Sequence, residues 1–505
     1  MTPAHTGTII GLRRCRRLPL AICVGLLLVA AHPSQAATLP VTSCADDGSP
    51  GTLRSVMYSA HNHDVVDLTR LTCSTITLTQ GEIDVSWIGS HRLAFITIDG
   101  PGRDQLTVVG AGPTRVFAFG DSYYQSQAEI NDLTITHSGP ANTWPACVLG
   151  ISGVLALNRV TVTGCHAHTP DFPYVGIIAG AVGAAQLVMS DSTVSNSSFT
   201  AYGNDIATGG GITISELGVI VDSAVVSNQA IAAVEFGYGG TAYPTSGGGI
   251  YSDGDLLIVN STIAGNSVEV TNPGEDGVGG GLFVRGTLTM IDSTVSGNTV
   301  DGMGAGLYKA SIAPGFDRGT TVSIQNSTIA GNSAGGAGGA LASQRPVWLA
   351  NSTIASNYSG AGGAVLFVHS GTYPGSGRLE LESTIIGSNT TGPAATYAAD
   401  LATDDVLTVT GAHSLVVAPA AGIVLPPDTL HDDPRLLPLD WNGGSVQTLA
   451  LAPGSPAIDA GSNPLGLSTD ERGAGYVRES GAAPDIGAFE VQPGPDPIFA
   501  GGFDP

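Results

Sequence analysis

Apolar and polar residues alternate over short stretches through most of the chain, and these stretches are rich in Ile, Val and Thr. Three neighbouring examples are Leu282–Val284, Leu288–Ile291 and the dipeptide Thr294-Val295. Alternation with a period of two is typical of β-strands with one buried face. Apolar residues do not recur at helical spacing across these three segments. The pattern therefore predicts short strands joined by tight corners.

A short phrase recurs between residues 131 and 389, at intervals of 25 to 38 residues between neighbouring copies. The clearest copies are Asn260–Asn266, Asp292–Asn298, Asn326–Asn332 and Asn351–Asn357, and less regular ones are Asp191–Asn196, Asp222–Asn228 and Glu382–Asn389. Small-residue runs that lead into an apolar pair precede the phrase, at Gly209–Ile212, Gly247–Ile250, Gly279–Leu282, Gly304–Leu307, Gly338–Leu341 and Gly362–Val365. Repetition at this period indicates a solenoid.

Three short strands in each unit describe one coil of a parallel β-helix. We predict an all-β chain that forms a single-stranded right-handed parallel β-helix, a pectin-lyase-like solenoid with N-terminal and C-terminal caps. The right-handed sense follows from the general handedness of parallel crossovers. We assign residues 37–130 to the N-terminal cap and first coils, 131–390 to the repeats, and 391–490 to the last coils and a further C-terminal region.

Equivalent residues of successive coils are expected to stack about 4.8 Å apart. The inward apolar ladder is expected to contain Ile263, Val295, Ile329 and Ile354. A second ladder is expected at a corner, where an amide side chain bonds its neighbours and Asn tolerates left-handed geometry. Its members are Asn266, Asn298, Asn332 and Asn357.

The Asn-Ser-Thr triplets allow a second interpretation, because Asn260, Asn326 and Asn351 each head a formal N-glycosylation sequon. The triplet follows the structural period, and its first residue is Asp or Glu in sister copies. A stacking position therefore explains all the copies.

The first 36 residues have the three parts of a secretory signal in order. Arg13, Arg14, Arg16 and Arg17 form the basic start, Leu18–Ala31 is apolar, and Ser34–Ala36 offers a small-x-small cleavage pattern. We therefore expect export, with a destination at the cell surface, in association with the outer membrane, or in the medium.

Without the signal, the chain keeps 14 basic and 42 acidic residues, a formal charge of −28. Nucleic acid is an improbable partner, because binding it requires a basic face. Lys309 is the one lysine in the sequence. Acidic composition suits a soluble exported protein and would suit loosely held calcium.

Four cysteines remain after cleavage, and four cysteines allow three pairings. An even count in an exported protein indicates disulfides. Proximity in the sequence favours Cys44 with Cys73 and Cys147 with Cys165. These bonds would be local staples near the N-terminal end.

Both ends of the stack are expected to be covered, because open ends would expose strand edges and core. Thr52 can cap a short helix in which Leu53, Val56, Met57 and Ala60 share one face. At the other end we expect a soluble cap, with Ala457-Ile458 and Ile486–Phe489 packing inward.

The stretch Cys44–Ser55, followed by Val65–Leu68 and Cys73–Leu78, resembles the N-terminal CSLREAI-type motif of bacterial exported β-helix proteins. Leu53-Arg54 keeps the core of that motif, and the next two residues depart from it. The repeats resemble those of the right-handed β-helix and polymorphic outer-membrane protein group. Four C-terminal segments are similar to the choice-of-anchor Q domain: Asn442–Leu449, Pro453–Asp459, Thr469–Gly473 and Pro484–Glu490.

These resemblances imply surface display or secretion, with a C-terminal region that anchoring or sorting machinery handles. Residues 491–505 form a linker and tail, and Pro497–Phe503 is similar to short tails on other exported Gram-negative proteins. A disordered end is the other interpretation of this tail.

Parallel β-helices include polysaccharide lyases and glycoside hydrolases, and a fold does not prove a function. A lyase of this kind needs a basic residue beside an acidic calcium site, and a hydrolase needs carboxylates about 5 to 10 Å apart. The arginines of the repeats are isolated: Arg285, Arg318, Arg345 and Arg378. The aspartates Asp191, Asp222 and Asp292 hold the stacking position, and Asp404-Asp405 and Asp432-Asp433 lie beyond the clear repeats. We therefore predict no catalytic residue and no cofactor.

Two histidine groups are candidate metal ligands: His61 with His63, and His166 with His168 beside Cys165. Each lacks a second group at matched spacing, and an exported cysteine is more often in a disulfide. We predict no metal site.

The expected function is a non-catalytic exported binding protein, a monomer whose long flanks adhere to extracellular polysaccharide or another cell-surface polymer. The alternative is a carbohydrate-active enzyme with a cleft in loops such as Tyr202–Asp205 or Glu235–Pro244, where Tyr238 and Tyr243 would stack on sugar rings.

Overall fold

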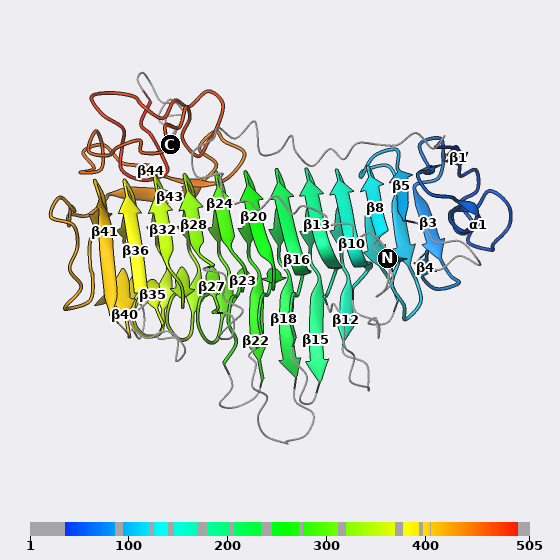
Figure 1. The fold of residues 1–505 in the computed structure, drawn as a ribbon, viewed down its shortest axis with the longest axis horizontal. Coiled ribbons are helices and arrows are strands. Elements are labelled where there is room, and N and C mark those ends of the chain that lie inside the picture. Colours follow the sequence, from blue (N-terminus) through cyan, green and yellow to red (C-terminus); the bar gives the residue numbers. More distant parts are fainter. Residues whose placement is uncertain are drawn as a thin grey trace, which may run out of the picture.

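The computed structural model describes residues 36–85, 94–120, 126–139, 146–168, 179–202, 207–233, 245–271, 276–311, 320–368, 377–392, 397–404 and 406–492. Parallel strands wind through these residues in successive coils along one axis (Figure 1). This confirms the parallel β-helix, and its handedness stays a prediction. The expected signal over 1–36 and the tail over 491–505 lie almost entirely outside the described residues.

The strands form three long sheets that line the sides of the coil. Sheet 1 contains β1 (Thr38–Pro40), β2 (Val65–Asp67), β4 (Ile83–Asp84), β5 (Phe95–Asp99), β7 (Phe117–Phe119), β8 (Ser126–Asn131), β10 (Val148–Asn158), β13 (Val182–Ser190), β16 (Ile212–Val221), β19 (Ile250–Ser252), β20 (Asp255–Val259), β23 (Leu282–Val284), β24 (Leu288–Ile291), β27 (Leu307–Lys309), β28 (Val322–Gln325), β31 (Leu341–Ser343), β32 (Val347–Ala350), β35 (Val365–Phe367), β36 (Gly377–Glu382), β40 (Leu401–Thr403) and β41 (Leu407–Ala412).

Sheet 2 contains β3 (Thr75–Leu78), β6 (Thr107–Gly110), β9 (Thr134–His137), β11 (Thr161–Thr163), β14 (Thr193–Ser195), β17 (Ala224–Val226), β21 (Thr262–Ala264), β25 (Thr294–Ser296), β29 (Thr328–Ala330), β33 (Thr353–Ala355), β37 (Ile385–Gly387) and β42 (Leu415–Val416). Sheet 3 contains β12 (His166–His168), β15 (Ser198–Tyr202), β18 (Gln229–Ala233), β22 (Ser267–Val270), β26 (Thr299–Val300), β30 (Ser333–Ala334), β34 (Tyr358–Ser359), β38 (Thr390–Thr391) and β39 (Tyr397–Ala398). A separate hairpin pairs β43 (Leu436–Asp440) with β44 (Thr448–Leu451).

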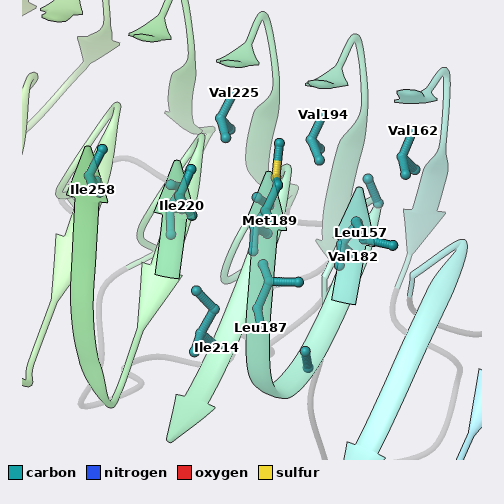
Figure 2. Close-up of a cluster of buried hydrophobic side chains, with 14 of the residues drawn as sticks. Leu157, Val162, Val182, Leu187, Met189, Val194, Ile214, Ile220, Val225 and Ile258 are labelled. Atoms are coloured by element: carbon teal, nitrogen blue, oxygen red, sulfur yellow. The ribbon is translucent and has the colours of Figure 1, made fainter. Parts of the chain in front are cut away.

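The apolar ladder expected inside the coil is present. Ile263 of β21 pairs in register with Val295 of β25, and Val295 pairs with Ile329 of β29. All three side chains are fully buried. Valines of sheet 2 and leucines of sheet 1 point into the same interior (Figure 2). One continuous core therefore runs along the stack and holds the sheets rigidly in place.

The expected asparagine ladder is also present, with a difference in backbone geometry. Asn298 Oδ1 accepts from the backbone N–H of Asn266 at 3.0 Å, and Asn332 Oδ1 accepts from that of Asn298 at the same distance. The left-handed φ falls on the preceding residues, for example Gly265 and Gly297, and not on the asparagines. The asparagine side chain points inward to bond its neighbours, so the residue before it makes the turn.

The first residue of each Asn-Ser-Thr triplet does adopt left-handed geometry, with φ of 46° at Asn260 and 47° at Asn326 and Asn351. Asn326 and Asn351 are at most 1% exposed. Their burial supports the stacking interpretation over glycosylation. The serine that follows forms a further buried ladder, which the sequence did not reveal: Ser261 N–H donates to Ser293 Oγ at 3.0 Å.

The N-terminal end has the expected helix, α1 (Leu53–Ser59), with Thr52 as its N-cap accepting from Ser55 N–H. Leu53 and Met57 of this helix pack on the core. Two disulfides, Cys44–Cys73 and Cys147–Cys165, pair the cysteines as sequence proximity favoured. Across the described part of the chain, no helix has the length and apolarity needed to cross a bilayer.

The C-terminal cap differs from the expectation, because it has two parts. Residues 413–432 cover the end of the stack, where Ile423 and Leu425 pack on the core. Residues 433–492, which we call the C-terminal region, lie along the flank of the later coils (Figure 1). Ala457, Ile486 and Phe489 are buried as expected, but their contacts include the flank strand β37.

Candidate ligand-binding face

The outer side of sheet 2 carries two straight files of mostly threonine residues over its first five strands. The first file is Thr75, Thr107, Thr134, Thr161 and Thr193, and the second is Thr77, Val109, Thr136, Thr163 and Ser195. We call these ten positions the threonine face. Each strand's register pairs these residues directly, so neighbours in a file lie about 4.8 Å apart, and the files are about 6.7 Å apart along the strand.

The threonine face is rigid because its strands stand on the core. Between the two files, each strand places an apolar residue inward, as Ile135 does on β9 and Val162 on β11, and both are fully buried. The threonines themselves are half-buried or exposed. A β-branched side chain has few rotamers, so its methyl and hydroxyl groups are held at defined positions.

None of the ten side chains is charged, and two ion pairs lie along the corner that precedes these strands. Arg103 bonds Asp191 at 2.8 Å, and Arg159 bonds Asp132 at 2.6 Å. The threonine face is therefore a neutral strip with a rim of ion pairs on an acidic protein.

Farther along the same sheet, the C-terminal region covers the continuation of the first file. Thr294, Thr328 and Thr353 occupy the equivalent position in later coils. Thr294 Oγ1 donates to the carbonyl of Gln447 at 2.6 Å, and Thr353 Oγ1 accepts from the N–H of Ala488 at 3.0 Å. Outward hydroxyls of this file therefore both donate to and accept from the segment of the chain that lies on the sheet.

The second file continues from Ser195 through Val226, Ala264 and Ser296 to alanines where the C-terminal region binds. These are Ala330 and Ala355, which are fully buried and contact Leu449 of β44. A methyl side chain lets an apolar residue approach the sheet, which a bulkier threonine would prevent. The outer positions of this file are thus suited to close packing in the covered coils.

Glu471 is a buried acid at this junction. Its Oε1 accepts from the backbone N–H of Thr328 at 3.0 Å, and its Oε2 pairs with the Thr328 hydroxyl. Burial raises the pKa of Glu471 well above its ordinary value, and the nearby carboxylates of Asp292 and Asp470 add to that rise. Burial likewise raises the pKa of Asp292 to about 6.

Inside the C-terminal region, Arg472 and Asp470 form a fully buried ion pair at 2.6 Å. The Arg472 guanidinium lies between the rings of Tyr476 and Phe489, at 3.9 and 3.8 Å from their centroids. Glu490 accepts from the backbone N–H groups of Ser480 and Asp485, and burial raises its pKa to about 8. These contacts stabilise the region that covers the sheet.

No family model, curated protein or solved structure matches this chain. Its function is therefore argued from its own residues.

The histidines that are candidate metal ligands make other contacts. Cys165 is in a disulfide, His166 Nδ1 lies 2.9 Å from Ser198 Oγ, and His168 packs edge-on against Tyr202. His61 lies near Asp64, and His63 stacks on Phe95. Among the described residues, no group of three or more His, Cys, Asp or Glu side chains is placed to hold a metal ion.

The isolated basic residues have structural contacts. Arg285 pairs with Asp253 at 2.8 Å and lies over the stacked rings of Tyr251 and Phe283. The Arg345 guanidinium donates to the carbonyl of Thr320. Lys309 is fully buried, and its Nζ donates to the carbonyls of Arg285 and Ala310.

The other candidate site residues lie outside the described residues or at structural corners. Arg318, Asp405 and the loop Glu235–Pro244 lie outside the described residues, as does most of Tyr202–Asp205. Asp191, Asp222 and Asp292 occupy the left-handed corner position that stacking required.

The sequence analysis did not predict the threonine face, although the sequence contains a pattern that indicates it. Thr-x-Thr triplets occur at Thr75–Thr77, Thr134–Thr136 and Thr161–Thr163. They precede or begin the clear repeats, where threonine was interpreted only as a strand-forming residue.

Proposed function

We propose that this protein is a non-catalytic exported binding protein whose threonine face holds a neutral, hydroxyl-rich extracellular polymer, of which polysaccharide is the leading class. The observation that carries the proposal is the pair of uncharged files on β3, β6, β9, β11 and β14, with threonine at every rung of the first file and at three of the five rungs of the second. A ligand with regularly repeated polar groups matches such an array better than a small molecule does.

The chemistry of threonine suits a sugar polymer. Each hydroxyl both donates and accepts, and each methyl offers an apolar contact to the C–H groups of a sugar ring. The covered half of the same file supports this assignment, because Thr294 donates to a carbonyl there and Thr353 accepts from an amide. Many weak, equivalent contacts along one polymer add up through multivalency.

Charge favours a neutral ligand over an acidic one. The chain without its signal carries a formal charge of −28, so long-range repulsion opposes a polyanion. The face itself holds no cation to offset that repulsion. The order of affinity is therefore expected to place neutral glycans above polyuronates.

The proposed location agrees with the covalent structure. Two disulfides indicate an oxidising environment outside the cytoplasm. Beyond that, we propose export through the N-terminal signal to the cell surface, the outer membrane or the medium. The CSLREAI-like and choice-of-anchor Q-like segments support recognition by sorting or anchoring machinery. We also propose that the acidic protein binds calcium loosely.

The carbohydrate-active alternative depends on the loops Tyr202–Asp205 and Glu235–Pro244. Only Tyr202 of these lies in the described residues, where it is 41% exposed and contacts His168. No observation on the described residues favours that alternative, so binding without catalysis is the function proposed.

The test is a binding screen of the mature protein against insoluble and soluble polysaccharides, read by sedimentation and affinity electrophoresis. Thr161→Asp introduces a charge on β11, the fourth of the five strands of the face, and is expected to weaken binding by about tenfold or more. Thr161→Val and Thr161→Ser separate the hydroxyl contribution from that of the methyl group.

Thr289→Asp is the matched control, because Thr289 is a half-buried outward threonine on sheet 1. It is expected to leave binding unchanged. Absence of binding to every neutral polymer would overturn the proposed function, and equal losses in Thr161→Asp and Thr289→Asp would reject the threonine face as the site.

A further inference from the structure

The threonine face is periodic in two directions. Along the stack, Thr107 pairs with Thr75 on one side and with Thr134 on the other, and Thr161 pairs with Thr134 and Thr193. Neighbours in a file lie about 4.8 Å apart, and the two files lie about 6.7 Å apart. The pairings of these five strands show no register shift. The outward side chains therefore form a small two-dimensional lattice.

The spacings of this lattice are close to those of ice. In ice each water oxygen is hydrogen-bonded tetrahedrally to four others at about 2.75 Å, the usual length of an O–H···O bond. Tetrahedral geometry then places second-neighbour oxygens about 4.5 Å apart and gives a repeat of about 7.3 Å along the hexagonal axis. Each of the two spacings of the threonine face differs from its counterpart in ice by less than about a tenth.

The difference is small enough to keep the whole face in phase with such a crystal. About 0.3 Å for each rung accumulates to roughly 1.2 Å over the four intervals from β3 to β14. That is well under half of the ice repeat, so no rung falls between two lattice positions. Between the two files there is a single interval, so the mismatch in that direction does not accumulate.

The side chains also suit contact with ordered water. A threonine hydroxyl can donate and accept, as every water molecule in ice does. Thr134 Oγ1 donates to the carbonyl of Arg103 at 2.8 Å, and Ser195 Oγ donates to Thr163 Oγ1 at 3.0 Å. These bonds fix the hydroxyl positions, and the oxygens of Thr134 and Ser195 still have a lone pair to accept from water.

The chain is held firmly where the face begins and near its other end. The disulfide Cys44–Cys73 fixes the backbone two residues before β3, and Cys147–Cys165 fixes it two residues after β11. Under the face, Val108 is fully buried in the same core as Ile135 and Val162. A surface that must match a crystal needs fixed spacing, and these constraints supply it.

We propose that the threonine face also binds the surface of ice crystals, with its two files aligned on rows of lattice oxygens. The ligand is frozen water, a different class from the polysaccharide proposed above, and the inference does not rest on that function. The disulfides indicate an environment outside the cytoplasm, where ice that grows in the medium is accessible.

Ice binding is tested with the mature protein in buffer without carbohydrate. A dilute solution is frozen slowly onto a cold surface, and the fraction of protein taken into the ice is compared with that of a non-binding protein of similar mass. The growth of a single ice crystal is also followed just below its melting point. We expect enrichment in the ice and a gap between the melting and growth temperatures.

Bulky substitutions locate the contact. Thr136→Tyr places a ring on β9, the middle strand of the five, and is expected to lower the ice-bound fraction by about tenfold or more, because the neighbouring threonines no longer reach the crystal. Thr163→Tyr on β11 is the second variant, used if Thr136→Tyr does not fold. Thr289→Tyr is the matched control on sheet 1 and is expected to leave ice binding unchanged.

The inference is overturned if the wild-type protein stays in the liquid and leaves crystal growth unchanged. It is also overturned if the folded face variants bind ice fully, or if Thr289→Tyr loses as much binding as they do. Binding to ice without binding to any neutral polysaccharide supports this inference and rejects only the proposed function, and the opposite pattern rejects only this inference.

Discussion

Glu471 accepts a hydrogen bond of 3.0 Å from the backbone N–H of Thr328, although 143 residues separate the two. The contact joins the C-terminal region to the outer side of sheet 2, and Glu471 is only 1% exposed. An ionised carboxylate in such a place would need a cation, but the charged neighbours that act on it are Asp292 and Asp470. Burial and these two carboxylates therefore favour the uncharged form of Glu471.

Glu471→Gln is accordingly expected to change the free energy of unfolding of the C-terminal region by less than about 1 kcal/mol, because an amide oxygen still accepts from Thr328. Glu471→Ala leaves that N–H buried without an acceptor and is expected to cost about 1–3 kcal/mol. Native-state hydrogen exchange of residues 433–492 measures both values.

Glu380 of β36 provides the control for these substitutions, since it is an exposed outward glutamate. Glu380→Ala is expected to be almost neutral. If Glu471→Gln destabilised the region as much as Glu471→Ala, the carboxyl group would be ionised in the fold and the interpretation above would be wrong.

The same burial predicts that the folded protein loses stability as pH rises. Burial raises the pKa of Asp292 from 3.8 to about 6 and that of Glu490 from 4.5 to about 8. A pKa raised on folding means that the folded state binds protons more tightly, so stability is full below the unfolded values and is lost as pH rises through the folded ones. Unfolding by urea from about pH 5 to about pH 9 is expected to show this decline.

Asp292→Asn tests the lower part of that decline. Asparagine already occupies the same left-handed position at Asn326, so the backbone is expected to accept it. The variant should lose the pH dependence near 6 and keep the part near 8 that belongs to Glu490. A pH profile identical to wild type would assign the lower step to another group.

The fold was predictable because stacking makes the sequence repeat itself. Val295 stands at a position that is Val or Ile in every clear copy, and Asn298 at one that is always Asn. Both lie where the repeat placed them, in the core and at the corner. Cys44 and Cys73 were paired correctly by proximity. Contacts that are local or periodic can therefore be predicted from the sequence.

The covered flank was not predictable, because its contacts are neither local nor periodic. Nothing near Glu471 in the sequence indicates Thr328, and one outward threonine resembles another until the register is known. The left-handed residue at the corner was misplaced by one position for a related reason. Gly297 and Asn298 both tolerate such geometry, and only the inward hydrogen bonds of Asn298 decide between them.

Gly487 allows the C-terminal region to approach sheet 2 closely. A Cβ at this position would lie 2.7 Å from Thr353 Oγ1 and 2.9 Å from Ile385 Cδ1, and the residue has a φ of 105°. Gly487→Ala is therefore expected to destabilise the docked region by about 1–3 kcal/mol through overpacking and backbone strain.

Gly466→Ala is the matched control for Gly487→Ala. Gly466 also has a positive φ, of 64°, but a Cβ there would meet no atom within 4 Å. It is expected to cost roughly 1 kcal/mol, from backbone geometry alone. Equal effects of the two substitutions on hydrogen exchange in residues 433–492 would remove close approach as the role of Gly487.

The asparagine ladder ends on an acid in a way that fits its direction. Asn298 Nδ2 donates to Asn332 Oδ1 at 2.9 Å, and the same pattern continues from coil to coil. At the last rung, Asn389 Nδ2 donates to Asp400 Oδ1 at 2.8 Å. Each asparagine donates its side-chain N–H to the next member of the ladder. The last member therefore needs only to accept a hydrogen bond, which a carboxylate can do.

Asn298→Ala interrupts this ladder at its centre. Asn298 is fully buried, accepts from the backbone N–H and the Nδ2 of Asn266, and donates to the carbonyl of Ile263 at 2.9 Å. Its removal leaves several buried polar groups unpaired, so we expect a loss of roughly 3 kcal/mol or more in the free energy of unfolding measured with guanidinium chloride. Thr299→Ala, at the exposed neighbouring position on β26, is expected to change it by less than about 0.5 kcal/mol. A small effect of Asn298→Ala would mean that water replaces the lost groups, and the ladder would then position the corner without stabilising it.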